Sequence, residues 1–123
     1  MILYYSIVFN QFTYSIMNKS YVVFCNFNDE EEAKKIAKEI VNNLLGACVT
    51  VSSSGTSYYK WEGKTVEESE FTITVKTHSL KLNRLIDWLK ENHSYDVPEI
   101  IALEIADGDP EYLKWIKNEV GQQ

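Results

Sequence analysis

The feature that most constrains the fold is a long stretch of strand-like sequence centred on residues 58–64. Apolar and polar side chains alternate over residues 47–52 and again over residues 71–76, which is the pattern of half-buried strands. Gly63 lies between the two arms and can take the positive φ that a tight turn requires. We therefore predict one β-hairpin from about Ala47 to Thr77, with arms that exceed the roughly five or six residues of an ordinary strand.

A hairpin of this length has consequences for assembly. The chain has 123 residues, of which 45% are hydrophobic, and this composition fits one globular domain with a single core. Little of such a chain is left to cover the exposed edges of a long two-stranded ribbon, and exposed edges invite pairing with another chain. The hairpin therefore favours an oligomer.

The net charge and the number of cysteines limit which classes of binding partner and which redox compartment are expected. Lys and Arg number 12 against 18 for Asp and Glu, and the net charge of −6 repels phosphate backbones and anionic membrane surfaces. We expect neither a nucleic-acid partner nor a membrane partner. Cys25 and Cys48 lie in strand-like apolar runs, which favours buried or reactive thiols in a reducing compartment over a disulfide framework.

The first 16 residues differ from the rest, because they carry no charge and many aromatic side chains. A basic start, a cleavage site and about 20 continuous apolar residues are all missing, so neither a secretory signal nor a transmembrane helix is expected. We treat residues 1–16 as an N-terminal extension of uncertain status and residues 17–123 as the folded domain. The extension reads as an extra strand, a flexible tail, or sequence upstream of a true start at Met17.

The remaining elements follow from periodicity and capping signals. A β-branched and aromatic run over residues 21–27 predicts the first strand, and residues 100–106 predict the last. Small polar residues over 52–55 predict a bend or bulge inside the first arm of the hairpin. The first helix is predicted to start at an N-cap of Asn28 or Asp29 and to stop at Gly46 as its C′ residue. The second is predicted to start at Ser79 and to end near His93. The third is predicted to start at Asp109, with Pro110 at its first helical position.

This order is β-α-β-β-α-β-α, which predicts an α+β, ferredoxin-like fold with an added C-terminal helix. Fold alone leaves many functions open. The sequence has no glycine-rich phosphate loop, no Gly-x-Ser-x-Gly and no His-Glu-x-x-His. We therefore expect neither enzymatic activity nor an organic cofactor.

Several motifs in register carry a resemblance to a known family. They are Leu45-Gly46-Ala47-Cys48-Val49-Thr50-Val51, Thr56-Ser57-Tyr58-Tyr59-Lys60-Trp61-Glu62-Gly63-Lys64, Val75-Lys76-Thr77, Tyr95-Asp96-Val97-Pro98-Glu99-Ile100-Ile101-Ala102-Leu103, and Gly108-Asp109-Pro110-Glu111-Tyr112-Leu113-Lys114-Trp115-Ile116. On these motifs the chain resembles the divalent-cation tolerance (CutA) family from Tyr21 to about Val120. One departure is His93-Ser94-Tyr95, where the family usually has His-Pro-Tyr.

The resemblance implies a cytoplasmic homotrimer of ferredoxin-like subunits whose long hairpins pair between neighbours. It also implies a role in the response to divalent metal ions such as copper. By position, the family's copper contacts fall on Cys25, His93 and Asn92, where Asn92 replaces a histidine and is a poor copper ligand. Thiolate selects Cu(I) and imidazole suits Cu and Zn, so Cys25 and His93 are the predicted metal ligands.

Topology argues against one compact site within a chain. We expect the end of the second helix to lie near the start of the first strand, which puts His93 roughly 10 to 15 Å from Cys25. A shared ion would then need another subunit or a shifted strand. Without metal, Cys25 reads as a small buried hydrophobe and His93 as a helix-end residue. The acidic runs at residues 29–32 and 67–70 read as capping and solvation, and Cys25 is the expected main metal ligand.

Two other functions stay open. The fold and trimer are similar to those of the PII signalling proteins, which suggests a trimeric sensor of a small ligand. Its inter-subunit clefts would be lined by Trp61, Glu62, Lys76, Tyr95 and Glu99. These side chains serve equally well to hold an interface. The third reading is a trimeric scaffold without a metal role.

Overall fold

The computed structural model describes residues 18–122. The predicted extension over residues 1–16 and the proposed start at Met17 lie outside the described residues. Within residues 18–122, no helix is long and apolar enough to cross a membrane.

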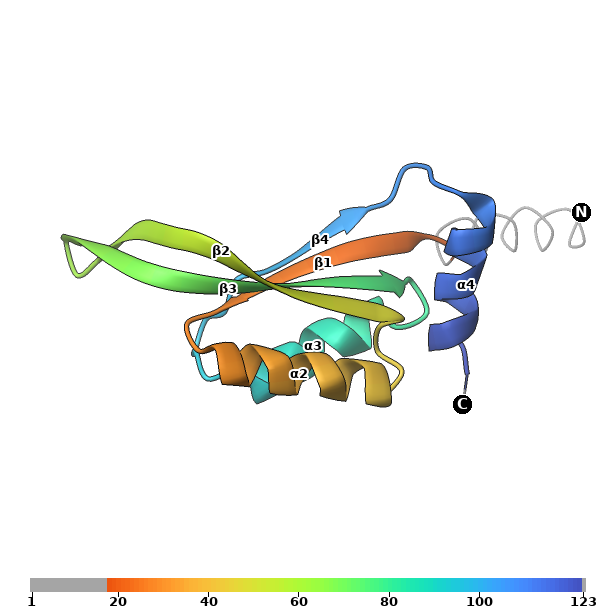
Figure 1. Cartoon of the computed structure of the whole chain (residues 1–123), viewed down its shortest axis with the longest axis horizontal. Helices are drawn as coiled ribbons and strands as arrows, with labels where there is room; N and C mark the ends of the chain where they lie inside the picture. Colours follow the sequence, from red (N-terminus) through yellow and green to blue (C-terminus); the bar gives the residue numbers. More distant parts are fainter. Residues whose placement is uncertain (1–17, 123) are drawn as a thin grey trace, which may run out of the picture.

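The described elements follow the predicted order (Figure 1). They are β1 (Ser20–Phe27), α2 (Glu30–Asn42), β2 (Cys48–Trp61), β3 (Lys64–His78), α3 (Leu82–Asn92), β4 (Ile100–Glu104) and α4 (Pro110–Val120). The strands form one antiparallel sheet in the order β2-β3-β1-β4. The mixed α+β fold is therefore confirmed, and the last strand ends at Glu104, two residues earlier than predicted.

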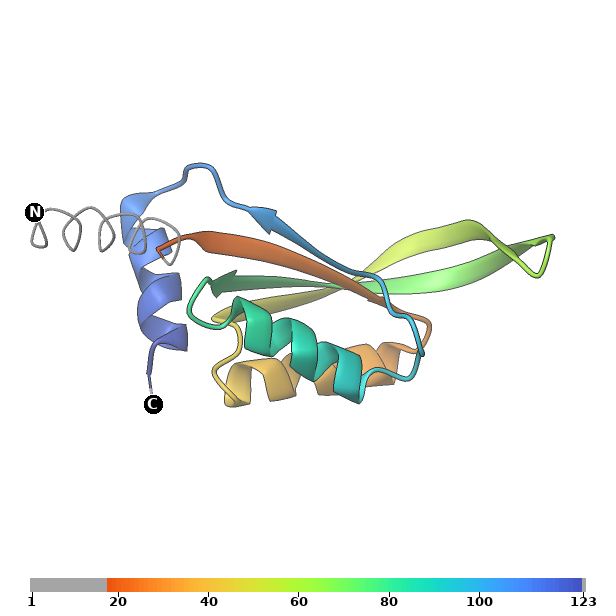
Figure 2. The same ribbon diagram turned by 180° about the vertical axis from the view of Figure 1, so that it is seen from behind.

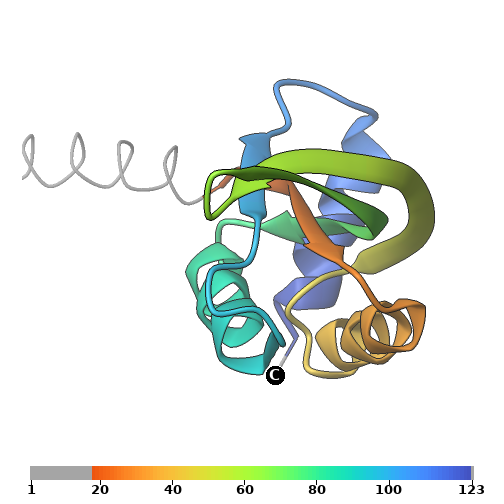
Figure 3. The same ribbon diagram turned by 90° about the vertical axis from the view of Figure 1, so that its left-hand side faces the viewer.

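Helices α2 and α3 lie side by side on one face of the sheet, whereas α4 packs across one end (Figures 1, 2 and 3). The core forms between the two helices and the sheet because the alternate residues of the central strands point toward them. Its largest fully buried apolar side chains there are Phe27, Ile40, Ile73, Leu85 and Leu89. Among residues 18–122, no helix covers the opposite face of the sheet.

The β2–β3 hairpin extends well beyond the helices (Figure 1). Its turn is Glu62-Gly63, with φ of 50° and 78°, and two successive positive φ values are what a type I′ hairpin turn requires. The predicted irregularity in the first arm is confirmed by a register shift between Ser53 and Gly55, where Gly55 has φ of 109°. The bulge increases the local twist of the long ribbon.

Two of the predicted N-caps are confirmed and one is wrong. Asp29 accepts a hydrogen bond from Glu31 N at 3.1 Å, and Asp109 accepts one from Tyr112 N at 3.0 Å just before Pro110. Ser79 does not cap α3, which begins at Leu82 after Lys81. The Ser79 hydroxyl instead accepts a hydrogen bond from Lys19 N at 3.2 Å, because the turn after β3 brings it beside the start of β1.

Gly46 is not the C′ residue of α2. The helix ends at Asn42, and Leu44 takes the left-handed conformation with φ of 58°. Gly46 is required for another reason. A Cβ at this position would lie 2.5 Å from Val75 Cγ1 and 2.9 Å from Ile40 Cγ2, so only glycine lets the chain pass between helix and sheet.

We predict that Gly46→Ala lowers the free energy of unfolding by about 1 to 3 kcal/mol, the usual cost of overpacking a core. Gly108→Ala is the matched control, since its Cβ would meet Leu113 at an ordinary 3.5 Å. Urea unfolding followed by circular dichroism measures both. Equal stabilities for the two variants would show that Val75 and Ile40 move aside without cost.

Candidate functional site

The end of α3 lies beside the end of β1. His93 Nε2 donates a hydrogen bond to Asn26 O at 2.8 Å, and the imidazole stacks on Phe27 with ring centroids 4.3 Å apart. The expectation that His93 lies near the start of β1 is therefore wrong. Strand β3 is antiparallel to β1, so a helix that returns along β3 runs parallel to β1 and ends where β1 ends.

Both ring nitrogens of His93 are engaged. While Nε2 donates to Asn26 O, Nδ1 accepts a hydrogen bond from Tyr95 N at 3.0 Å. A neutral imidazole has one donor and one acceptor nitrogen, so no lone pair is left for a metal ion in this arrangement. Asn92 also has a local partner, because its amide donates to Trp88 O at 2.8 Å. His93 thus fastens the turn after α3 to β1.

Cys25 lies on the helix-facing side of β1 and is fully buried. Burial, with smaller contributions from the negative charges of Glu99 and Glu32, raises the pKa of its thiol to about 12. A thiol with this pKa is protonated at neutral pH, and the thiolate is the form that binds metal ions. Cys25 therefore behaves as a small apolar core residue in the folded chain.

Four carboxylates surround this end of the sheet: Glu32 of α2, Glu68 and Glu70 of β3, and Glu99, which precedes β4. We call them the carboxylate cluster. Their proximity is visible in their mutual effects, since Glu68 and Glu99 both raise the pKa of Glu70. No ion pair within residues 18–122 involves any of the four, because the ion pairs there join Lys19 to Glu104 and Lys34 to Glu30.

Neutral side chains hold three of the carboxylates in place. Asn26 donates to Glu99, and Asn28 Nδ2 donates to Glu68 Oε1 at 3.0 Å. Ser94 donates to both oxygens of Glu32, from its backbone nitrogen at 3.0 Å and from its hydroxyl at 2.8 Å. Tyr59 OH donates to Glu68 Oε2 at 2.8 Å, and the pKa of Glu68 is lowered, chiefly by this bond.

Glu70 and Tyr95 are incompletely satisfied. Glu70 Oε2 and Tyr95 OH are both buried, and neither has a hydrogen-bond partner in the part of the chain that the structure describes. Burial raises the pKa of Glu70, a hydrogen bond from Ser57 opposes the rise, and the neighbouring carboxylates add to it. Burial also raises the pKa of Tyr95 to about 12, together with the charges of Glu68 and Glu70. Unpaired buried polar atoms are costly, so a cation or donor from outside the chain would be stabilising here.

The arrangement does not form a complete metal site within one chain. Among residues 18–122, no three His, Cys, Asp or Glu side chains lie close enough to hold one ion together. Cys25 is protonated and His93 uses both nitrogens, so the donor set predicted for copper does not fit the ion as it lies.

The predicted ligand-binding residues are only partly gathered. Tyr95 and Glu99 lie at the carboxylate cluster, where Asn26 holds Glu99. Trp61 and Glu62 are at the hairpin turn, and Trp61 is 66% exposed. Lys76 lies further along β3, opposite Val22 and Cys48. A cleft formed by all five would therefore have to involve more than one chain.

Sequence reasoning treated the acidic runs separately and did not predict that they meet. One signal was available. Residues 29–32 directly follow β1 and Glu99 directly precedes β4, and antiparallel pairing of these strands puts both segments at one end of the sheet. Glu68 and Glu70 then join them because β3 lies beside β1.

Comparisons with known proteins agree with this architecture. A family model described as CutA1 divalent ion tolerance protein matches residues 21–119. The divalent-cation tolerance protein CutA of Thermus thermophilus is 42% identical over 100 residues, which are 81% of this chain and 97% of that protein. The chloroplastic protein CutA of Arabidopsis thaliana is 42% identical over 99 residues, 80% of this chain, but the match spans only 54% of the plant protein.

Solved structures give the same result. The CutA1 structure from Oryza sativa has a TM-score of 0.80 and 38% identity, and it covers 85% of this chain and 95% of its own. The Thermus thermophilus structure has a TM-score of 0.78 and 41% identity, covering 81% and 97%. Similarity in sequence and in structure therefore extends over most of the residues described.

We predict that Cys25 resists thiol reagents in the folded protein. With a pKa of about 12 against an ordinary 9.0, its thiolate fraction at pH 8 is about a thousandfold smaller than that of a free thiol. The variant Cys48→Ser isolates Cys25, and its reaction with an aromatic disulfide reagent should become fast only in denaturant. Rapid reaction without denaturant would contradict the burial of Cys25.

Proposed function

The chain belongs to the CutA1 divalent ion tolerance protein family, and on this premise we propose that it acts in divalent-cation tolerance as a ferredoxin-like homotrimer that binds the cation without catalysis. The carboxylate cluster is the observation that carries the proposal. It gathers four acids that lack an ion-pair partner within residues 18–122. Because the chain spans about half of the plant relatives it matches, functions of their remaining segments do not transfer to it.

The uncovered face of the sheet supports the trimer. Phe24 pairs with Ile101 and Val22 pairs with Leu103, and these four side chains lie on the face opposite α2 and α3. Ile101 is 46% exposed and Leu103 is 54% exposed. Apolar residues gathered on an open sheet face favour burial against other copies of the chain, and a closed ring also covers strand edges.

The hairpin supports the same assembly. Tyr58 and Trp61 are each 66% exposed near its tip, which reaches beyond the helices of its own chain (Figure 1). Aromatic side chains contribute strongly to interfaces when they are buried. We propose that the tip packs on a neighbouring subunit.

We propose that divalent cations are attracted to the carboxylate cluster and that a neighbouring subunit completes their coordination. Carboxylate oxygens suit hard divalent ions such as Mg²⁺ and Mn²⁺. The unpartnered Glu70 Oε2 supports this location. For a soft ion such as Cu(I), Cys25 stays the predicted ligand, but His93 would have to leave Asn26 and Tyr95 first.

We propose a cytoplasmic location, on the ground that Cys25 and Cys48 are both free thiols. The relatives vary in this respect. The Arabidopsis protein is named chloroplastic, and the structure from Archaeoglobus fulgidus is described as periplasmic.

We predict that the protein has the mass of a trimer, about 43 kDa for three 14.3 kDa chains, by light scattering at micromolar concentration. Ile101→Glu should shift it toward monomer, because a charge on the apolar sheet face cannot be buried without a partner. Val41→Glu is the control, since Val41 is 41% exposed on α2 and away from that face. A monomeric mass for the unaltered protein would refute the assembly.

We predict that Glu70→Gln and Glu99→Gln each weaken Mn²⁺ binding at least about threefold, because each removes one charge from the cluster. Glu111→Gln on α4 makes the same charge change at the other end of the molecule and should leave binding unaltered. Because the pKa of Glu70 is raised, it takes up a proton at higher pH than an ordinary carboxyl, so binding should weaken from pH 7 to pH 5. Calorimetric titration measures each case.

Three further outcomes separate the alternatives. If Glu70→Gln binds Mn²⁺ as tightly as Glu111→Gln does, the carboxylate cluster is not the site. A Cu(I) titration in which Cys25→Ser loses more affinity than His93→Ala would assign soft ions to the thiol. A trimer that binds neither ion would leave the small-ligand sensor and the scaffold, which a small organic ligand retained through purification would distinguish.

A further inference from the structure

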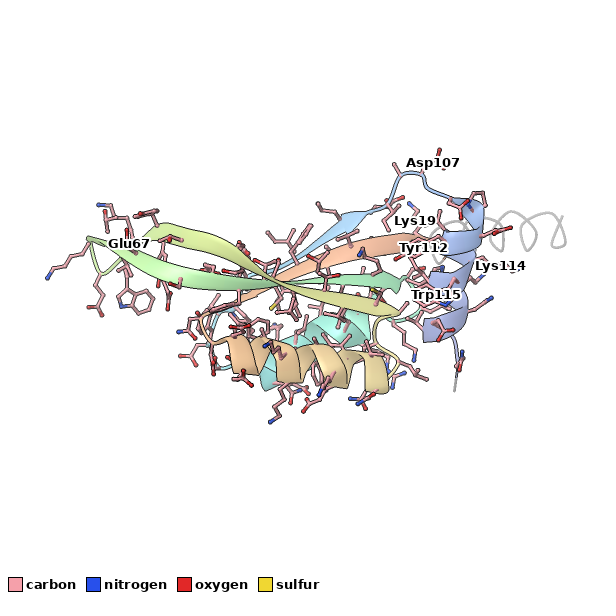
Figure 4. All side chains as sticks on the ribbon, viewed as in Figure 1. Lys19, Glu67, Asp107, Tyr112, Lys114 and Trp115 are labelled. Atoms are coloured by element: carbon pink, nitrogen blue, oxygen red, sulfur yellow. The ribbon has the colours of Figure 1, made fainter. Side chains whose placement is uncertain are left out.

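His78 is the histidine that the candidate site does not use. It ends β3 and pairs with Ser20 at the start of β1, so it lies at the opposite end of the sheet from the carboxylate cluster. Figure 4 shows Lys19, which precedes Ser20, at the α4 end of the molecule and Glu67 at the other end, on the hairpin. Only 2% of His78 is exposed, so its polar atoms need partners within the protein.

Both ring nitrogens of His78 have polar neighbours. Leu80 N donates a hydrogen bond to Nδ1 at 3.1 Å, so Nδ1 carries no proton. Nε2 therefore carries the proton of the neutral ring, and it lies 3.3 Å from Asn18 Oδ1. A proton added at Nδ1 would point at the N–H of Leu80, and the hydrogen bond between them would be lost. The arrangement therefore requires the neutral ring.

This hydrogen bond closes the turn that follows β3. Lys81 N donates to His78 O at 2.9 Å in the same turn. The turn is also joined to the start of β1, because Ser79 N donates to Lys19 O at 2.8 Å and Lys19 N donates to Ser79 Oγ at 3.2 Å. The imidazole thus holds the backbone in the conformation that these bonds to β1 need.

The same turn packs against α4. A Cβ at Gly121, the C-cap of α4, would lie 3.7 Å from Leu80 Cδ1, so the end of the helix meets the turn. Ile116 and Val120 of α4 are fully buried, although neither belongs to the core between the sheet and helices α2 and α3. Helix α4 contacts β3 and β1 instead. It therefore has an apolar contact surface of its own, separate from the main core.

The charges around His78 are mostly positive. Lys114 and Lys117 of α4, Lys19 before β1 and Glu104 at the end of β4 line the same recess as His78. The one acid among them is engaged, because Lys19 Nζ lies 3.3 Å from Glu104 Oε1. Burial, the larger cause, and the positive charge of Lys117 lower the pKa of His78. A charged imidazole is therefore disfavoured while the turn and α4 are in place.

We propose that His78 is a pH switch, in which protonation of the ring breaks the hydrogen bond from Leu80 N and α4 then separates from the end of the sheet. The core between the sheet and helices α2 and α3 stays folded. The closed form is fully favoured above about pH 6.5, the pKa of an unconstrained histidine. Its advantage over the open form falls about tenfold per pH unit from there down to the lowered pKa of the buried ring.

Hydrogen exchange of the full-length protein, followed by NMR, measures this opening. After correction for the intrinsic effect of pH on exchange, the opening constants of the Ile116 and Val120 amides should rise about tenfold from pH 6.5 to pH 5.5. The amide of Ile40, on α2, should stay more strongly protected than both at each pH. In the same samples, the signal of labelled His78 imidazole carbons should show a pKa below 6.5.

Two variants that do not titrate assign the effect to the ring. His78→Asn places a side-chain oxygen where Nδ1 lies, so it can still accept from Leu80 N. Opening of α4 in this variant should be the same at pH 6.5 and pH 5.5. His78→Gln moves its polar atoms beyond that position and loses the acceptor, so α4 should open more than in His78→Asn at both pH values.

Four results would overturn the proposal. An α4 opening constant that does not change with pH, or a His78 signal that titrates at 6.5 or above, would show that the folded chain tolerates the charged ring. The same pH dependence in His78→Asn would assign the proton to another group. Equal protection of Ile40 and Val120 at pH 5.5 would mean that the protein unfolds as a whole.

The switch and the proposed cation function are tested separately. The carboxylate cluster lies at the other end of the sheet, and the exchange measurements use no metal ion. Failure of either proposal therefore leaves the other standing.

Discussion

The antiparallel pairing of β1 with β3 is the interaction on which the rest of the structure depends. Its register sets Val23 opposite Val75 and Cys25 opposite Ile73, so the buried side chains of both strands face α2 and α3 together. A slip of one residue would turn this set toward the uncovered face. The same pairing returns α3 alongside β1 and brings His93 to Asn26. The core and the site therefore share one cause.

Most of the fold could be predicted because short-range sequence patterns determine most of its strands and helix starts. Alternation predicted the strands, and Asp29 and Asp109 predicted two helix starts. The failures came where tertiary contacts decide. Gly46 is fixed by the closeness of Ile40 and Val75, which lie in other elements, and no local signal distinguishes that role from a helix stop.

The candidate site was harder to predict than the fold, because its members come from separate elements. Glu32 read correctly as part of an acidic helix start, and that reading gave no hint that it lies near Cys25. The position of His93 was derived with the wrong direction for α3, although strand order alone contained the answer. A site formed between subunits is also beyond what one chain can reveal. Trp61 and Lys76 lie away from Glu99 within the chain, so only the assembly could bring these residues together.

The charge distribution then decides which ion the folded chain favours. A soft ion at Cys25 must displace a proton from a thiol of pKa about 12, roughly 4 kcal/mol more than from an ordinary thiol. It must also break two hydrogen bonds of His93, each contributing about 1 kcal/mol. A hard cation at Glu70 and Glu99 would incur neither cost. It would also offset the charges of Glu68 and Glu99, which add to burial, the larger cause, in raising the pKa of Glu70. On these grounds we propose the carboxylates, rather than Cys25, as the groups that attract a divalent cation at neutral pH.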